Sequence, residues 1–207
     1  MTRMGAPDIY ARLMAGADGG HDAFDRHVVA SILSLAWVEA ARDGSPLPAW
    51  VGLAPSALEG MVAGLFPAAS AILEPASVPL AVLGDDEAAV RDLLWMYASE
   101  GSPLQRDLSA MIARRCTRPN HLWQDLGLRD RGELSRLMRR HFKPLAERNS
   151  QDMKWKKFLY RMICRSEGFS LCSAPVCSDC DDFDICFGAE DGEAILAHIR
   201  SGRSLAV

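Results

Sequence analysis

Apolar residues recur at helical spacing along most of this chain. Between His21 and Arg42 they return every three or four positions and form one stripe, made of Phe24, Val28, Ile32, Leu35 and Val38. This spacing is typical of one face of an amphipathic α-helix. No convincing strand-like alternation and no internal repeat interrupt the helical pattern. The pattern therefore predicts an all-α fold.

Start and stop signals divide the rest of the chain into further helices. Ser56 is expected to cap a helix that ends near Leu65, and Asp85 or Asp86 to cap one that Gly101 stops. Proline opens a helix at 103–116, which turns four apolar residues inward: Leu104, Leu108, Met111 and Ile112.

The C-terminal half continues in the same way. Asp130 begins a helix with Glu133 at the capping-box position, and further helices are expected at 151–166 and 190–200. Three prolines and many small residues predict an irregular connection at 67–83. We expect a helical domain over 1–166, with this weak internal connection, followed at 167–207 by a cysteine-rich segment and a short helix.

Composition is that of a soluble globular protein. Of 207 residues, 49% are hydrophobic and 24% are charged, and the formal net charge is −4. No stretch is long and apolar enough for a membrane span, and the first residues lack a secretory pattern, so we expect a cytoplasmic protein. The acidic balance gives no general case for nucleic-acid binding.

Charge is distributed unevenly near the C-terminus. Residues 129–165 hold 12 of the 23 Lys and Arg residues and four acids, whereas 174–199 hold seven acids and no Lys or Arg. A basic segment therefore directly precedes an acidic one.

Four of the six cysteines fall within fifteen residues, in the stretch CSAPVCSDCDDFDIC. Cys172, Cys177, Cys180 and Cys186 form a C-x4-C-x2-C-x5-C array. Thiols stay reduced in the cytoplasm, so such a cluster indicates metal ligands or redox groups before disulfides or a chance grouping.

The spacing favours an iron–sulfur cluster over zinc and leaves zinc open. Structural zinc sites commonly use two C-x2-C pairs with a longer spacer, whereas compact arrays with a single pair are closer to iron–sulfur ligation. Four aspartates in the loop either solvate it or lower the reduction potential of a cluster: Asp179, Asp181, Asp182 and Asp184.

The array and three segments upstream resemble the NifQ family of nitrogen fixation. The array ends in CFG, and it follows HLWQDLGL from His121, RGELSRLM from Arg131 and DMKWKKFLYRMIC from Asp152. The resemblance runs from about Arg115 to Glu190, over a third of the chain, and is weak in the first hundred residues.

This resemblance implies a molybdenum-handling protein. NifQ proteins carry an iron–sulfur cluster that includes molybdenum and supply the metal for the nitrogenase iron–molybdenum cofactor. The implied partners are the cofactor-assembly scaffold and the nitrogenase iron protein, and the implied cluster ligands are Cys172, Cys177, Cys180 and Cys186. Phosphate-loop, dinucleotide, nucleophile-elbow and H-E-x-x-H motifs are absent, so the sequence indicates a metal donor rather than an enzyme.

The basic segment offers a surface for molybdate, the oxyanion that is the metal source. Lys154, Lys156 and Lys157 lie just before the cysteine loop, and Lys and Arg pair well with oxyanions. The alternative is a solvated helix face or a docking patch for an acidic partner.

His121 has two interpretations. With Asn120 as the cap, its ring covers the start of a short helix above Trp123; alternatively it is a metal ligand together with Cys116. Two other functional classes also stay open: a zinc-stabilised helical interaction module and an iron–sulfur redox protein.

Overall fold

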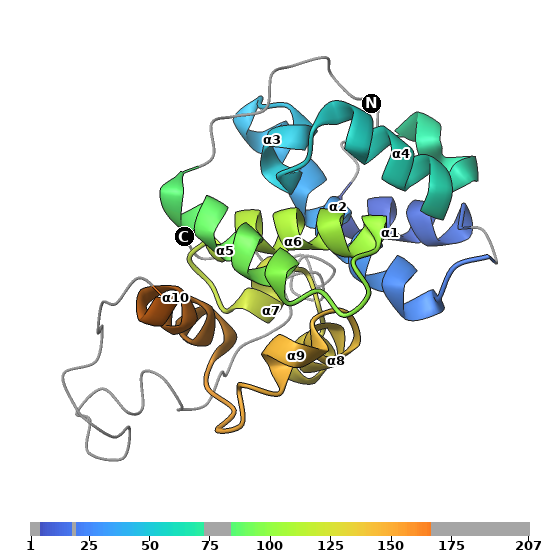
Figure 1. Ribbon diagram of the computed structural model, residues 1–207. Helices are drawn as coiled ribbons and strands as arrows, with labels where there is room; N and C mark the ends of the chain where they lie inside the picture. The colour runs from blue at the N-terminus through green and yellow to red at the C-terminus, as the bar shows by residue number, and fades with distance from the viewer. Residues whose placement is uncertain (1–4, 18–19, 73–83, 167–207) are drawn as a thin grey trace.

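The computed structural model describes residues 5–17, 20–72 and 84–166, and all regular structure within them is helical (Figure 1). The all-α prediction is confirmed. The predicted cysteine-rich segment and the helix at 190–200 lie outside the described residues. The elements are α1 (Ala6–Ala15), α2 (Ala23–Asp43), α3 (Leu47–Val51), α4 (Pro55–Leu65), the 3-10 helix η1 (Pro67–Ile72), α5 (Asp85–Met96), α6 (Pro103–Cys116), α7 (Leu122–Asp125), α8 (Arg131–His141), α9 (Lys143–Ala146) and α10 (Trp155–Ser166).

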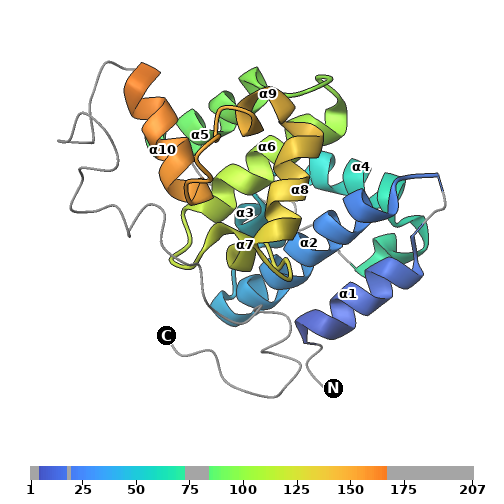
Figure 2. The same ribbon diagram turned by 90° about the horizontal axis from the view of Figure 1, so that it is seen from below.

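Helix α2 is the centre of the structure. Figure 2 shows it between α1 and α8, and every residue from Val28 to Ala36 is buried. The prediction of a single apolar stripe was therefore too narrow, because a helix covered by neighbours on all sides is buried on all its faces. Its two central serines satisfy their hydroxyls inside the helix: Ser31 donates to the His27 carbonyl and Ser34 to the Ala30 carbonyl.

Two predicted helix caps in the first half were wrong. Helix α4 begins with Pro55 at its first position and Ala54 as N-cap, two residues earlier than a Ser56 cap requires. Gly84 is the N-cap of α5, and Asp85 and Asp86 lie in its first turn, where acids favour the helix dipole. This helix ends at Met96, well before Gly101.

Caps in the second half follow the sequence more closely. Ser102 caps α6 and accepts from the Gln105 N–H, while Gln105 Oε1 accepts from the Ser102 N–H, which completes a capping box. Asp130 caps α8 and accepts from the Glu133 N–H at 2.9 Å. Glu133 does not close that box, because its carboxylate accepts the Arg129 N–H instead.

Helix α10 begins at Trp155, four residues later than predicted. Residues 149–153 form a non-helical turn where the first turn of the helix was expected. The Asn149 side chain accepts from the Met153 N–H and donates to the Met153 carbonyl, both at 2.9 Å. Asp152 has a positive φ of 54°, which is outside the range of a right-handed α-helix. This turn sets the direction in which α10 leaves α9.

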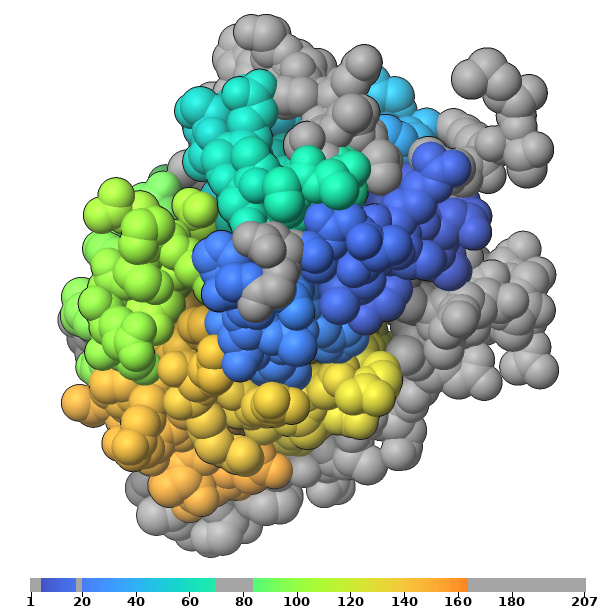
Figure 3. All heavy atoms as spheres, turned by 90° about the vertical axis from the view of Figure 1, so that its right-hand side faces the viewer, coloured from blue at the N-terminus to red at the C-terminus, as the bar shows by residue number. Residues whose placement is uncertain are grey.

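One apolar core joins the helices on both sides of residues 73–83. It extends from Ile9 in α1 to Leu159 in α10. Figure 3 shows the start of α2 between α4 on one side and α8 and α9 on the other, and α5 packs against α6 and α10. The first part of the expected irregular connection is the 3-10 helix η1. Of the described helices, none has both the length and the hydropathy to cross a membrane.

Candidate functional site

Helix α10 carries the chain into the cysteine array, so its attachment to the other helices is the part of the candidate site that the structure describes. The four predicted ligands, Cys172, Cys177, Cys180 and Cys186, lie outside the described residues. Cys172 follows Ser166, the end of α10, by six positions in the chain. Covalent geometry therefore limits their separation to about 20 Å.

Apolar side chains hold one face of α10 in the core. Trp155, Phe158 and Leu159 are buried, and the rings of Trp155 and Phe158 meet edge to face at 5.8 Å. The Trp155 indole N–H donates to Ser135 Oγ at 3.2 Å, so its one polar atom is satisfied by α8.

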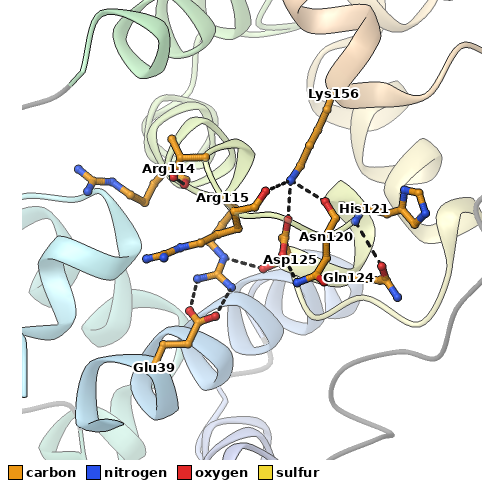
Figure 4. A network of polar contacts seen from close by, with 10 residues as sticks. Glu39, Arg114, Arg115, Asn120, His121, Gln124, Asp125 and Lys156 are labelled. Carbon is orange, nitrogen blue, oxygen red and sulfur yellow. Dashed lines mark hydrogen bonds and ion pairs between the residues drawn. The ribbon is translucent and has the colours of Figure 1, made fainter. Parts of the chain in front are cut away.

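Lys156 fastens a second face of α10 by polar contacts. Its ammonium donates to the carbonyls of Arg118 and Asn120 and to Oδ2 of Asp125, at 2.5, 2.7 and 2.5 Å (Figure 4). Three acceptors match the three N–H donors of a lysine. The Asp125 side chain is 2% exposed, so this ion pair is largely shielded from water.

The contacts continue from Asp125 into the core. The other oxygen of its carboxylate accepts from Asn120 Nδ2 at 3.0 Å, and its carbonyl accepts from Arg115 Nε at 2.5 Å. Arg115 is fully buried and also forms a two-pronged pair with Glu39 of α2. We call these five residues, Lys156, Asp125, Asn120, Arg115 and Glu39, the Lys156 network; it ties α2, α6, α7 and α10 together.

The three lysines grouped by the sequence have different surroundings. Lys156 has committed its donors to the protein itself, and Lys157 is exposed. Lys154 is half-buried. Lys157 is therefore the member of this group best placed to attract an oxyanion from solution.

Much of the basic segment is neutralised internally. Arg129 pairs with Glu133, Arg131 with Asp152 and Arg140 with Asp25. Two further arginines keep their charge but lie over aromatic rings, Arg136 over Phe24 at 3.9 Å and Arg148 over Tyr97 at 5.1 Å. The high count of basic residues therefore overstates the free positive charge of this surface.

His121 itself is the N-cap of α7, so the prediction that Asn120 caps this helix was wrong by one residue. The His121 N–H donates to Gln124 Oε1 at 3.2 Å. Asn120 lies one residue before the cap, and its side-chain Nδ2 donates to Asp125 Oδ1 at 3.0 Å.

Cys116 is buried at the end of α6. Burial raises the pKa of its thiol to about 12, and the nearby Asp125 and Glu87 add to the shift against the opposing effect of Lys156. The thiol is therefore protonated near neutral pH, whereas metal binding uses the thiolate. Within the described ranges, no group of three or more His, Cys, Asp or Glu side chains could hold a metal ion.

Sequence reasoning missed the centre of the Lys156 network. Arg115 follows Met111 and Ile112 at helical spacing, so it continues the inward stripe of α6. A charged residue at an inward position signals a buried ion pair. Its partner Glu39 lies 76 residues away and carries no comparable signal.

A family model described as NifQ matches residues 28–188. The chain belongs to the NifQ family. Protein NifQ homolog of Sinorhizobium fredii (strain NBRC 101917 / NGR234) is 40% identical over 172 residues, which are 83% of this chain and 75% of that protein. Protein NifQ of Rhodobacter capsulatus is 38% identical over 160 residues, which are 77% and 87% of the two chains. No solved structure matches this chain.

NifQ membership associates the chain with nitrogen fixation. The match also extends further toward the N-terminus than the segments from Arg115 onward indicate, because it begins in α2. It ends at residue 188, two residues beyond Cys186, and thus includes all four cysteines of the array. The Lys156 network lies within it as well.

Proposed function

We propose that this NifQ protein holds an iron–sulfur cluster containing molybdenum on Cys172, Cys177, Cys180 and Cys186 and donates the molybdenum for assembly of the nitrogenase iron–molybdenum cofactor. The observation that carries the proposal is the NifQ match across the whole cysteine array. Molybdenum is the cargo in this scheme, and the protein acts as a donor rather than as an enzyme.

The donor set suits the cluster. Four closely spaced thiolates can ligate the iron of an iron–sulfur centre, and cysteines are the usual ligands of such centres. Cys116 is a poor fifth candidate because its thiol is buried and protonated. The helical domain would hold α10 in place while the array carries the metal.

The surroundings of the array support delivery. Acidic residues from Asp179 to Glu193 give the segment a negative charge that a basic partner surface can recognise. The proposed recipients are the cofactor-assembly scaffold and the nitrogenase iron protein. Thiolate ligands of this kind require reducing conditions, which the cytoplasm provides.

Metal analysis of protein purified without oxygen tests the proposal. We expect a brown protein that contains iron, sulfide and molybdenum. A colourless protein with zinc would favour the helical interaction module instead, and iron without molybdenum, together with reversible reduction, would favour a redox protein.

A matched pair of cysteine variants tests the ligand assignment. Cys180→Ala should lose most of the iron and molybdenum, whereas Cys116→Ala should retain both. Unchanged metal content in Cys180→Ala would contradict the assignment of the array cysteines as cluster ligands.

A further inference from the structure

A polar hollow opens beside α10, and none of the five residues of the Lys156 network lines it. It has a volume of about 310 Å³, and residues 148–151 and Arg161 line it, with Met153, Phe158 and Met162 as its apolar part. Its rim therefore comes from two elements, the turn after α9 and the outer side of α10.

The charge of this hollow is positive. Arg148 and Arg161 are the charged residues of its lining, and Asn149, Ser150 and Gln151 are neutral polar residues. Among the described residues that line it, none is acidic. The nearby Asp152 is paired with Arg131 at 3.1 Å, which reduces its repulsion of an anion.

The rim is held in shape before any ligand arrives. Asn149 bonds to both the N–H and the carbonyl of Met153, and the Arg131 guanidinium donates to the Asp152 carbonyl. Arg148 lies over the Tyr97 ring at 5.1 Å, which limits the positions of its guanidinium. A turn and an Arg148 side chain that are already ordered lose less entropy when the rim binds an anion.

We infer that this hollow binds molybdate, as a tetrahedral oxyanion held between the Arg148 and Arg161 guanidiniums. Arginine donates pairs of N–H groups in a fixed planar geometry, which suits oxyanions. The volume admits the ion with some of its waters, since one water occupies roughly 30 Å³ of the liquid. This inference rests on the proposed function and deepens it by naming where the metal source first binds.

The position of the hollow fits that role. Arg161 lies on the last described helix, three residues before Cys164, and α10 continues into the segment that bears the array. An oxyanion bound here would be near the chain segment on which the metal is to be incorporated.

Calorimetric titration of sodium molybdate into the metal-free full-length protein tests the inference. We expect Arg148→Gln and Arg161→Gln each to weaken binding about tenfold or more, since each removes a charge-assisted contact. Arg139→Gln is the matched control, because Arg139 is an exposed arginine of α8 that does not line the hollow. Its affinity should equal that of the wild type, and circular dichroism should show all three variants folded.

Three results would overturn the inference: no binding of molybdate by the wild type, wild-type affinity in both hollow variants, or displacement of molybdate by equimolar sulfate. The titration uses metal-free protein, so its outcome is independent of the metal content that tests the proposed function. A protein that carries the cluster but binds no molybdate would refute the hollow alone.

Discussion

Lys156 and Asp125, 31 residues apart in the chain, form an ion pair in which 2.5 Å separates Nζ from Oδ2. The pair fastens α10 to α7 next to the fully buried Arg115 (Figure 4). Since α10 carries the chain into the cysteine array, this contact links the helical core to the proposed metal site.

Lys156→Met should therefore destabilise the protein. It leaves the Asp125 carboxylate buried without its cation, and such a loss typically costs about 2–4 kcal/mol of unfolding free energy when one partner is partly exposed. Denaturation of the metal-free, reduced protein measures the change. Lys157→Met is the control: Lys157 is exposed, so we expect less than about 0.5 kcal/mol. Equal losses in the two variants would contradict the role of Lys156.

Arg115 and Glu39 should show strong energetic coupling. Arg115→Met leaves the partly exposed Glu39 without its partner and the Asp125 carbonyl without a donor, at a cost of about 2–4 kcal/mol. In the Arg115→Met/Glu39→Gln double variant the unpaired charge is also removed, so the total loss should fall short of the sum of the single losses. A double-mutant cycle on unfolding free energies measures this, and simple additivity would exclude the coupling.

The Cys116 thiol should make the folded protein less stable at alkaline pH. Its thiol titrates near pH 9 in the unfolded chain and at a pKa of about 12 in the folded protein. Between these values the unfolded state releases a proton that the folded state keeps, so stability falls as the pH rises above about 9. The slope from this group is at most about 1.4 kcal/mol per pH unit.

Comparison with Cys116→Ala isolates this effect. The difference in unfolding free energy between the wild type and Cys116→Ala should stay constant up to about pH 8 and shrink between pH 9 and pH 10.5. A constant difference across the whole range would show that the thiol titrates alike in both states.

Asp25 should contribute to stability above acid pH. Burial alone would raise the pKa of its carboxyl, but hydrogen bonds and charge interactions with His141 and Arg140 outweigh burial and lower it. Stability from this group is present above its unfolded pKa of about 4 and is lost as the pH falls through the folded value. Asp25→Asn should thus be less stable at pH 7 and should lose less stability between pH 5 and pH 3. Parallel acid-unfolding curves of the two proteins would refute this.

Some helix boundaries could be predicted and others could not, for local reasons. The α6 helix starts where predicted because Ser102, Pro103 and Gln105 provide a complete local signal. The start of α10 was missed because it depends on the hydrogen bonds of Asn149 with Met153 and on the positive φ of Asp152. Apolar periodicity through 151–166 does not reveal such a turn.

Some features of the candidate site could likewise be predicted from the sequence, and others could not. The cysteine array was identified from spacing within fifteen residues, and the upstream segments pointed to the family that the comparison then established. The grouping of Lys154, Lys156 and Lys157 gave no sign that Lys156 faces inward while Lys157 faces solvent. The hollow between Arg148 and Arg161 likewise requires two elements to be placed side by side.

The helical class, the position of the cysteine array and the resemblance to NifQ could all be predicted from the chain alone, because periodicity and motif spacing are properties of neighbouring residues. The pairing of the charged side chains depends on how the helices pack. Arg115 pairs with Glu39, which is 76 residues away in the sequence, and Lys156 pairs with Asp125, which is 31 residues away. Helix packing determines these partners, because a buried charge needs a partner and packing places residues that are distant in the sequence next to each other.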